Sequence, residues 1–142
     1  MSKKTAIIAI ATLTLSFNSL SAYDLKSNMQ LLNTELSEVQ RSLIVSDQEG
    51  VKKSIERFSK DAQELLGNKE RFAAMLPTDK KAKAAEAVMS AQIIDHNVKI
   101  ILDAIENKDN KSGRVRREAA QTAYTYIEHA CFRCHNIVRD RY

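Results

Sequence analysis

The sequence has few of the residues that interrupt regular structure or cross-link small domains. Its 142 residues include 3 glycines, 1 proline, 2 cysteines and no tryptophan. Sheets of short strands need many turns, so this composition disfavours an all-β domain. Two cysteines are too few for a disulfide-dense scaffold. The chain is 44% hydrophobic and 28% charged, which argues against disorder and indicates one helical domain.

The N-terminal segment has the pattern of a secretory signal peptide. Two lysines precede an apolar run over residues 5–17, and the segment ends in small residues at Ala22. A membrane anchor is the alternative, but the run is shorter than the ~20 apolar residues that a spanning helix needs. We expect residues 1–22 to be cleaved, leaving residues 23–142 as an exported domain without stable membrane insertion. Loss of the two lysines lowers the net charge from +4 to +2, too little to indicate nucleic-acid binding.

Apolar residues recur at spacings of three and four in four stretches of the remaining chain. This periodicity predicts four amphipathic helices, each with one face to bury. The first two stripes are Leu25, Met29, Leu32, Leu36, Val39 and Leu43, then Val51, Ile55, Phe58, Ala62 and Leu65. The third is Val88, Met89, Ile93, Val98, Ile101, Leu102 and Ile105, and the fourth is Val115, Ala119, Ala123, Tyr126, Ile127, Ala130 and Cys134.

Capping residues and helix breakers predict where these helices begin and end. Ser46 and Glu49 have the spacing of a capping box before the second helix. Gly67 is suited to end that helix, Thr78 to begin the third and Gly113 to begin the fourth. Short links between four such helices predict an all-α, antiparallel four-helix bundle.

One motif near the C-terminus carries specific chemistry. Cys131, Cys134 and His135 form a C-x-x-C-H sequence, and it contains both cysteines of the chain. This is the attachment pattern of c-type haem. Cysteines three positions apart lie about one helical turn from each other, so their sulfurs can bond to the two vinyl groups of a haem. The histidine that follows can then ligate the iron from one face.

Three other interpretations of this motif are weaker. A redox-active C-x-x-C pair stands at the start of a helix after a strand, and no strand is predicted here. A zinc site would have to use Cys131, Cys134, His135 and His129, all within seven residues and without a second cluster. A structural disulfide fits an exported protein, but it leaves the adjacent histidine unexplained.

The export signal, the four helices, the motif near the C-terminus and Arg139 four residues past His135 together resemble the class II c-type cytochromes. These are cytochrome c′ and its low-spin relatives of the c-556 type. The resemblance implies a four-helix bundle that holds one covalently attached haem c, with His135 as the proximal iron ligand. It covers residues 23–142 in architecture, but its specific part is only residues 131–139.

The residue on the other face of the iron is less directly indicated. Met29 lies on the first stripe, where methionine often only fills the core. In the family that Cys131–Arg139 resembles, a first-helix residue covers this face, and it is methionine in the c-556 type. The resemblance therefore implies Met29 as distal ligand, ahead of Met75, Met89 and His96. By the same resemblance Arg139 lies beside the proximal pocket, and Lys26 stands in for the cation that contacts a propionate.

Together these features imply a periplasmic electron carrier rather than an enzyme. Arg133, Arg139 and Arg141 make the haem end basic, which suits an acidic redox partner protein. A second basic cluster, ~25 Å away along the last helix, is expected to be a solvated face; it consists of Lys111, Arg114, Arg116 and Arg117. The alternative is a five-coordinate, cytochrome c′-like protein that binds nitric oxide or carbon monoxide, and a third class is a haem subunit of a larger enzyme. Family members include monomers and homodimers.

Overall fold

The computed structural model describes residues 25–139, so the expected signal peptide and Arg141 lie outside the described residues. Within that range the chain is all-helical and contains no strand, which confirms the expected class. The elements are α1 (Leu25–Ile44), α2 (Gln48–Leu66), α3 (Lys69–Met75), the 3-10 helix η1 (Thr78–Lys83), α4 (Ala84–Glu106) and α5 (Gly113–Val138). No described helix has both the length and the apolar character needed to cross a membrane.

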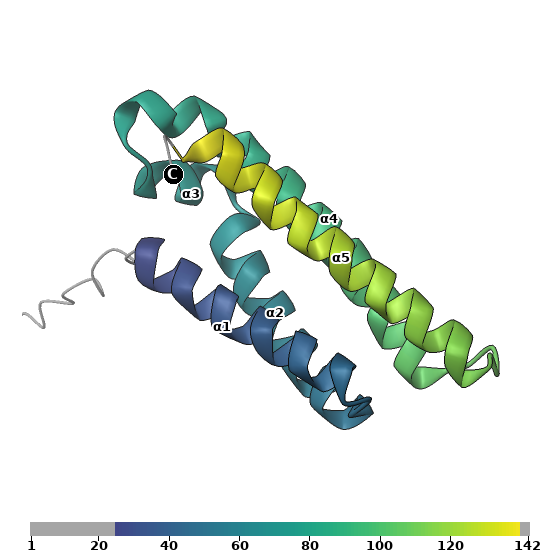
Figure 1. The fold of residues 1–142 in the computed structure, drawn as a ribbon. Coiled ribbons are helices and arrows are strands. Elements are labelled where there is room, and N and C mark those ends of the chain that lie inside the picture. Colours follow the sequence, from purple (N-terminus) through teal and green to yellow (C-terminus); the bar gives the residue numbers. More distant parts are fainter. Residues whose placement is uncertain (1–24, 140–142) are drawn as a thin grey trace, which may run out of the picture.

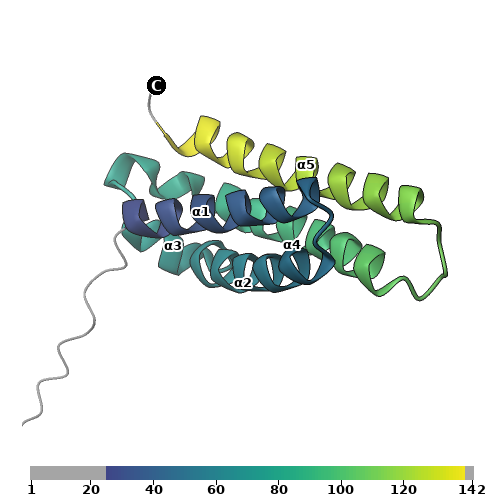
Figure 2. The ribbon, with the colours of Figure 1, turned by 60° about the horizontal axis from the view of Figure 1, so that its bottom comes forward.

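The long helices form a helical bundle. α4 and α5 lie side by side along most of their length, and α1 packs on α2 (Figure 1). α2 joins the two pairs by packing on α4, whereas α1 meets α5 over a short stretch only. The start of α1, the short helix α3 and the end of α5 lie at the same end of the bundle (Figure 2). This arrangement brings residues from the two ends of the domain close together.

The first two predicted stripes are confirmed by the core, whereas the buried face of α4 differs from the third predicted stripe. Val39, Ile55 and Phe58 are fully or almost fully buried, and the other members of the first two stripes pack in or against the core. In α4 half of the buried residues are alanine or serine, and both α5 and α2 pack on this helix. The buried residues of α4 are Ala84, Ala87, Ser90, Ala91, Ile94, Asn97, Val98 and Ile101. Met89 was expected in this core, but 41% of its surface is exposed.

Two expected helix starts were wrong. The N-cap of α2 is Asp47, whose carboxylate accepts a hydrogen bond from the Gly50 N–H at 3.0 Å. Ser46 cannot cap, because it adopts a left-handed conformation (φ 59°) to make the turn after α1. Thr78 begins only the 3-10 helix η1, because its lysine-rich sequence offers no apolar stripe to bury. α4 therefore begins at Ala84.

The segment between Gly67 and Pro77, for which no regular helix was expected, contains α3. Asn68 caps this helix by accepting a hydrogen bond from the Arg71 N–H at 2.8 Å. Its single buried residue, Phe72, is only 1% exposed and anchors the short helix to the core. One buried aromatic side chain in a helix of seven residues leaves too short a pattern for periodicity to detect.

A buried carboxylate stands out in the interface between α1 and α2. Glu35 is 2% exposed, and its Oε1 lies 3.2 Å from Nε of Arg57. Its other oxygen, Oε2, has no hydrogen-bond partner among the described residues. Burial, followed by the charge of Asp61, raises the pKa of Glu35 to about 7. Arg57, which also pairs with Glu38, acts in the opposite direction and offsets this only in part.

This raised pKa predicts a protein that is less stable at high pH. The folded state holds the Glu35 proton up to a pH of about 7, whereas the unfolded chain releases it near 4.5. The stabilising contribution is therefore complete below pH 4.5 and is lost as pH rises through about 7. Glutamine does not titrate, so the unfolding free energy of Glu35→Gln does not carry this loss. Between pH 5 and pH 8 we expect the difference in unfolding free energy between the variant and the unmodified protein to shift by about 2–3 kcal/mol in favour of the variant. Urea unfolding at several pH values measures this difference.

Glu56→Gln is the matched control, because Glu56 is an exposed carboxylate of α2 and is not among the groups that shift the pKa of Glu35. The difference in stability between this variant and the unmodified protein should change little over the same pH range. If the unfolding free energies of Glu35→Gln and the unmodified protein changed in parallel with pH, the raised pKa of Glu35 would be contradicted.

Candidate functional site

A cleft opens between the helices at the end of the bundle where α1 starts and α5 ends. Its space, including the open mouth, is about 530 Å³. α1, α2, α4 and α5 all contribute to its walls, which are largely apolar. The lining residues are Met29, Leu32, Asn33, Leu36, Phe58, Leu66, Ser90, Ile94, Cys131, Cys134 and His135.

The cleft brings together four of the six residues that the sequence indicated. Met29 lies just over one turn into α1, and Cys131, Cys134 and His135 lie in the last turns of α5. The two helices start and end at the same end of the bundle (Figure 2), so residues more than a hundred positions apart line one space. The thioether and the C-x-x-C-H motif therefore share a single, mostly apolar cleft.

Both cysteines are free thiols in protected surroundings. Cys134 is buried and Cys131 is half-buried. Burial, aided by the nearby Cys134, raises the pKa of Cys131 to about 11, and burial also raises the pKa of Cys134. Redox-active C-x-x-C pairs need the opposite shift, because their chemistry depends on a readily formed thiolate. Cys131 and Cys134 also lie near the end of a 26-residue helix, whereas a redox-active pair stands at the start of a helix.

His135 lies half-buried where the last turn of α5 meets the cleft. Burial and, to a smaller extent, the positive charge of Arg139 lower its pKa. Both effects favour the neutral imidazole, which is the form that coordinates metals. The Arg139 N–H donates to the His135 carbonyl at 2.8 Å, which ends the helix one turn after the histidine.

The remaining candidates do not line the cleft. Arg139 and Lys26 are both exposed, and neither lines it. Met89 and His96 are exposed residues of α4, and Met75 packs against the core at the end of α3. His129 is exposed on α5. Within residues 25–139 no three His, Cys, Asp or Glu side chains are grouped to hold a metal ion, which disfavours the zinc interpretation.

Sequence reasoning missed the contribution of α4 to this site. Ser90 is buried, lines the cleft and donates a hydrogen bond from Oγ to the Ala130 carbonyl at 3.1 Å. Its hydroxyl also interacts with the Cys134 thiol. A serine inside a helix gives no sequence signal for such a position, because only the close packing of α4 on α5 makes it adjacent to the motif.

An ion pair ties these two helices together beside the motif. Nη2 of Arg133 lies 3.2 Å from Oε2 of Glu86 on α4. Arg133 was expected to make this end of the protein basic, but Glu86 compensates much of its charge. An electrostatic surface for a redox partner would therefore depend less on Arg133 than the sequence suggests.

Comparisons with protein-family models, with curated proteins and with solved structures return no match to this chain. The nature of the site is therefore judged from its own residues. Two thiols one helical turn apart with an imidazole beside them are the groups that c-type haem attachment uses, and a thioether in the same apolar cleft could supply a second iron ligand. The residues present fit this group.

Proposed function

We propose that this protein is an exported monohaem c-type cytochrome that carries electrons between periplasmic partner proteins. In this proposal the sulfurs of Cys131 and Cys134 hold the haem, His135 ligates the iron from one face and Met29 from the other. The single observation that carries the proposal is that Met29 and the C-x-x-C-H motif line the same cleft.

The arrangement of the helices supports the class of protein. Four long helices, with short links from α1 to α2 and from α4 to α5, fit an antiparallel four-helix bundle of the cytochrome c′ kind. Such bundles hold cofactors between facing helices, and the cleft here is lined by residues from all four long helices. In this arrangement α3 and η1 form the longer link between α2 and α4.

Each donor has a distinct task in the proposed site. Bound haem supplies a one-electron couple between ferrous and ferric iron. The two cysteines fix the position of the group, and His135 supplies a neutral imidazole nitrogen. Met29 supplies a thioether, and a methionine–histidine pair raises the reduction potential of such iron. The apolar side chains around them, such as Phe58 and Ile94, exclude water from the iron.

The visible absorption spectrum of the haem-loaded protein tests this proposal. It should be recorded in both oxidation states, with and without carbon monoxide. We expect low-spin spectra, a weak sulfur-to-iron band in the oxidised form and little response to the gas. A high-spin spectrum that changes readily with carbon monoxide would support the gas-binding alternative instead. Absence of haem after expression with a c-type maturation system would contradict both functions.

A further inference from the structure

A second cavity lies near the other end of the bundle, where α1 ends and α5 begins. Its space, including the open mouth, is about 540 Å³. From Arg117 in this cavity to Cys131 in the cleft, α5 extends ~20 Å at ~1.5 Å per residue, so the two spaces are separate. One wall is apolar and consists of Leu43, Val51, Ala104, Ile105 and Ala120.

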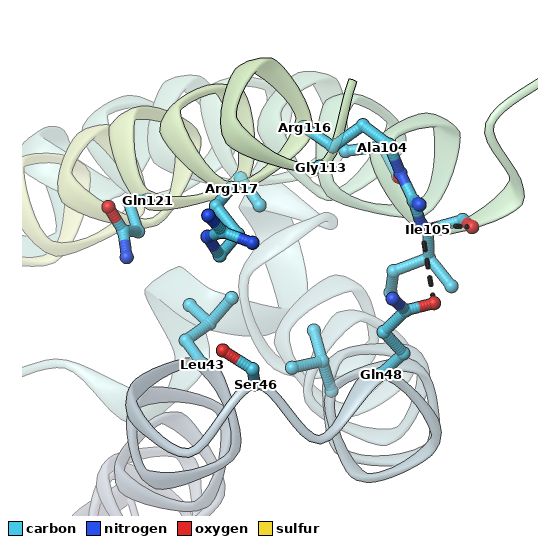
Figure 3. A pocket seen from close by; sticks show the side chains of 11 residues that line it. Leu43, Ser46, Gln48, Ala104, Ile105, Gly113, Arg116, Arg117 and Gln121 are labelled. Atoms are coloured by element: carbon cyan, nitrogen blue, oxygen red, sulfur yellow. Dashed lines mark hydrogen bonds between the residues drawn. The ribbon is translucent and has the colours of Figure 1, made fainter. Parts of the chain in front are cut away.

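Two arginines of α5 face this cavity in different ways (Figure 3). Arg116 is held in place: Nε donates to the Ala104 carbonyl at 2.6 Å and Nη2 to the Ile105 carbonyl at 3.0 Å. Nη2 also donates to Gln48 at 3.2 Å. Arg116 thus satisfies carbonyls at the end of α4, and within residues 25–139 no carboxylate pairs with it.

Arg117 has no such partners. Its guanidinium extends into the space between α5 and the turn that follows Leu43 (Figure 3), and it makes no hydrogen bond or ion pair with the described residues. It lies against the first turn of α5, since a Cβ on Gly113 would be 3.4 Å from its Nη1. The partial positive charge of that helix end adds to its own.

The described lining contains no carboxylate. The nearest acidic residue along α5, Glu118, pairs with Arg114 at 2.9 Å instead. The cavity therefore combines an unneutralised guanidinium with an apolar wall, and the polar side chains of Ser46 and Gln121 flank the guanidinium (Figure 3). The sequence predicted a solvated basic face here, and Lys111, Arg114 and Arg117 are indeed exposed, but Arg116 and Arg117 also line this open cavity.

We propose that this cavity binds a small carboxylate with a short apolar chain. The planar guanidinium of Arg117 suits bidentate pairing with a carboxylate. The apolar chain would cover the wall formed by Leu43, Val51 and Ala120. This site does not depend on the haem proposal, because it uses none of the residues that line the first cleft.

Hexanoate is a suitable probe for the purified, haem-loaded protein. Titration followed by backbone amide chemical shifts should show saturable changes in the first turns of α2 and α5. We expect a dissociation constant on the order of millimolar or below for a ligand of this size. Arg117→Gln should weaken binding by about tenfold or more, because it removes a charge-assisted pair.

Matched controls separate a built site from general charge attraction. Arg114→Gln removes an arginine three residues away that already pairs with Glu118, and it should leave hexanoate binding unchanged. Hexanol, which lacks the charge, and inorganic phosphate, which lacks the chain, should each bind at least tenfold more weakly. The proposal would be overturned if Arg117→Gln bound hexanoate as tightly as the unmodified protein, or if Arg114→Gln weakened binding as much as Arg117→Gln. It would also be overturned if phosphate bound as tightly as hexanoate, or if hexanoate gave no saturable shift. Unchanged far-ultraviolet circular dichroism shows that each variant remains folded.

Discussion

Replacing both cysteines, Cys131→Ala with Cys134→Ala, is expected to abolish covalent haem completely. The two thiols are the only cysteines of the chain, and both line the cleft with His135. Without them no thioether bond can form, so any haem would be held by coordination alone and would leave when the protein is denatured. A haem stain after denaturing electrophoresis measures this outcome. The doubly substituted protein should give no stained band.

Phe132→Ala provides the matched control for this experiment. Phe132 stands between the two cysteines, but it is 58% exposed and does not line the cleft. We expect this variant to retain covalent haem at the level of the unmodified protein. A stained band that survives in the double cysteine variant would refute the attachment site. Circular dichroism of each variant shows whether the helices persist without covalent haem.

Met29→Leu is expected to convert a six-coordinate, low-spin iron into a five-coordinate iron that binds carbon monoxide. Leucine has nearly the volume of methionine, so the changed packing in the cleft should cost less than ~1.5 kcal/mol. Only the thioether is lost, and with it the sulfur-to-iron band. The reduction potential should fall, because methionine ligation raises it. Visible spectra with and without carbon monoxide and a redox titration measure these changes.

Met89→Leu makes the same chemical change at an exposed position of α4, away from the cleft. Its spectra and potential should match those of the unmodified protein. If Met29→Leu also leaves the spectrum unchanged, Met29 is not an iron ligand. Met29 would then only fill the core, and another group would have to occupy the distal face.

Much of the fold could be predicted because its helices are amphipathic and their stripes are regular. Every residue of the first two stripes lies in the core or packs against it, since spacings of three and four leave one face to bury. The third was less well predicted because α4 buries small residues such as Ala87 and Ser90, which hydrophobicity alone does not mark. Local hydrogen bonds decided the helix starts, where Asp47 rather than Ser46 caps α2.

The sequence by itself determined the helical class and the local C-x-x-C-H spacing, because both depend on residues close together in the chain. Only the tertiary structure decided that Met29 shares a cleft with His135, that Ser90 contacts this site and that Arg117 extends into a second cavity. It also placed Glu35 in a helix interface where its charge is costly. These relations join residues of different helices, so they depend on how the helices pack and not on the pattern of any one of them.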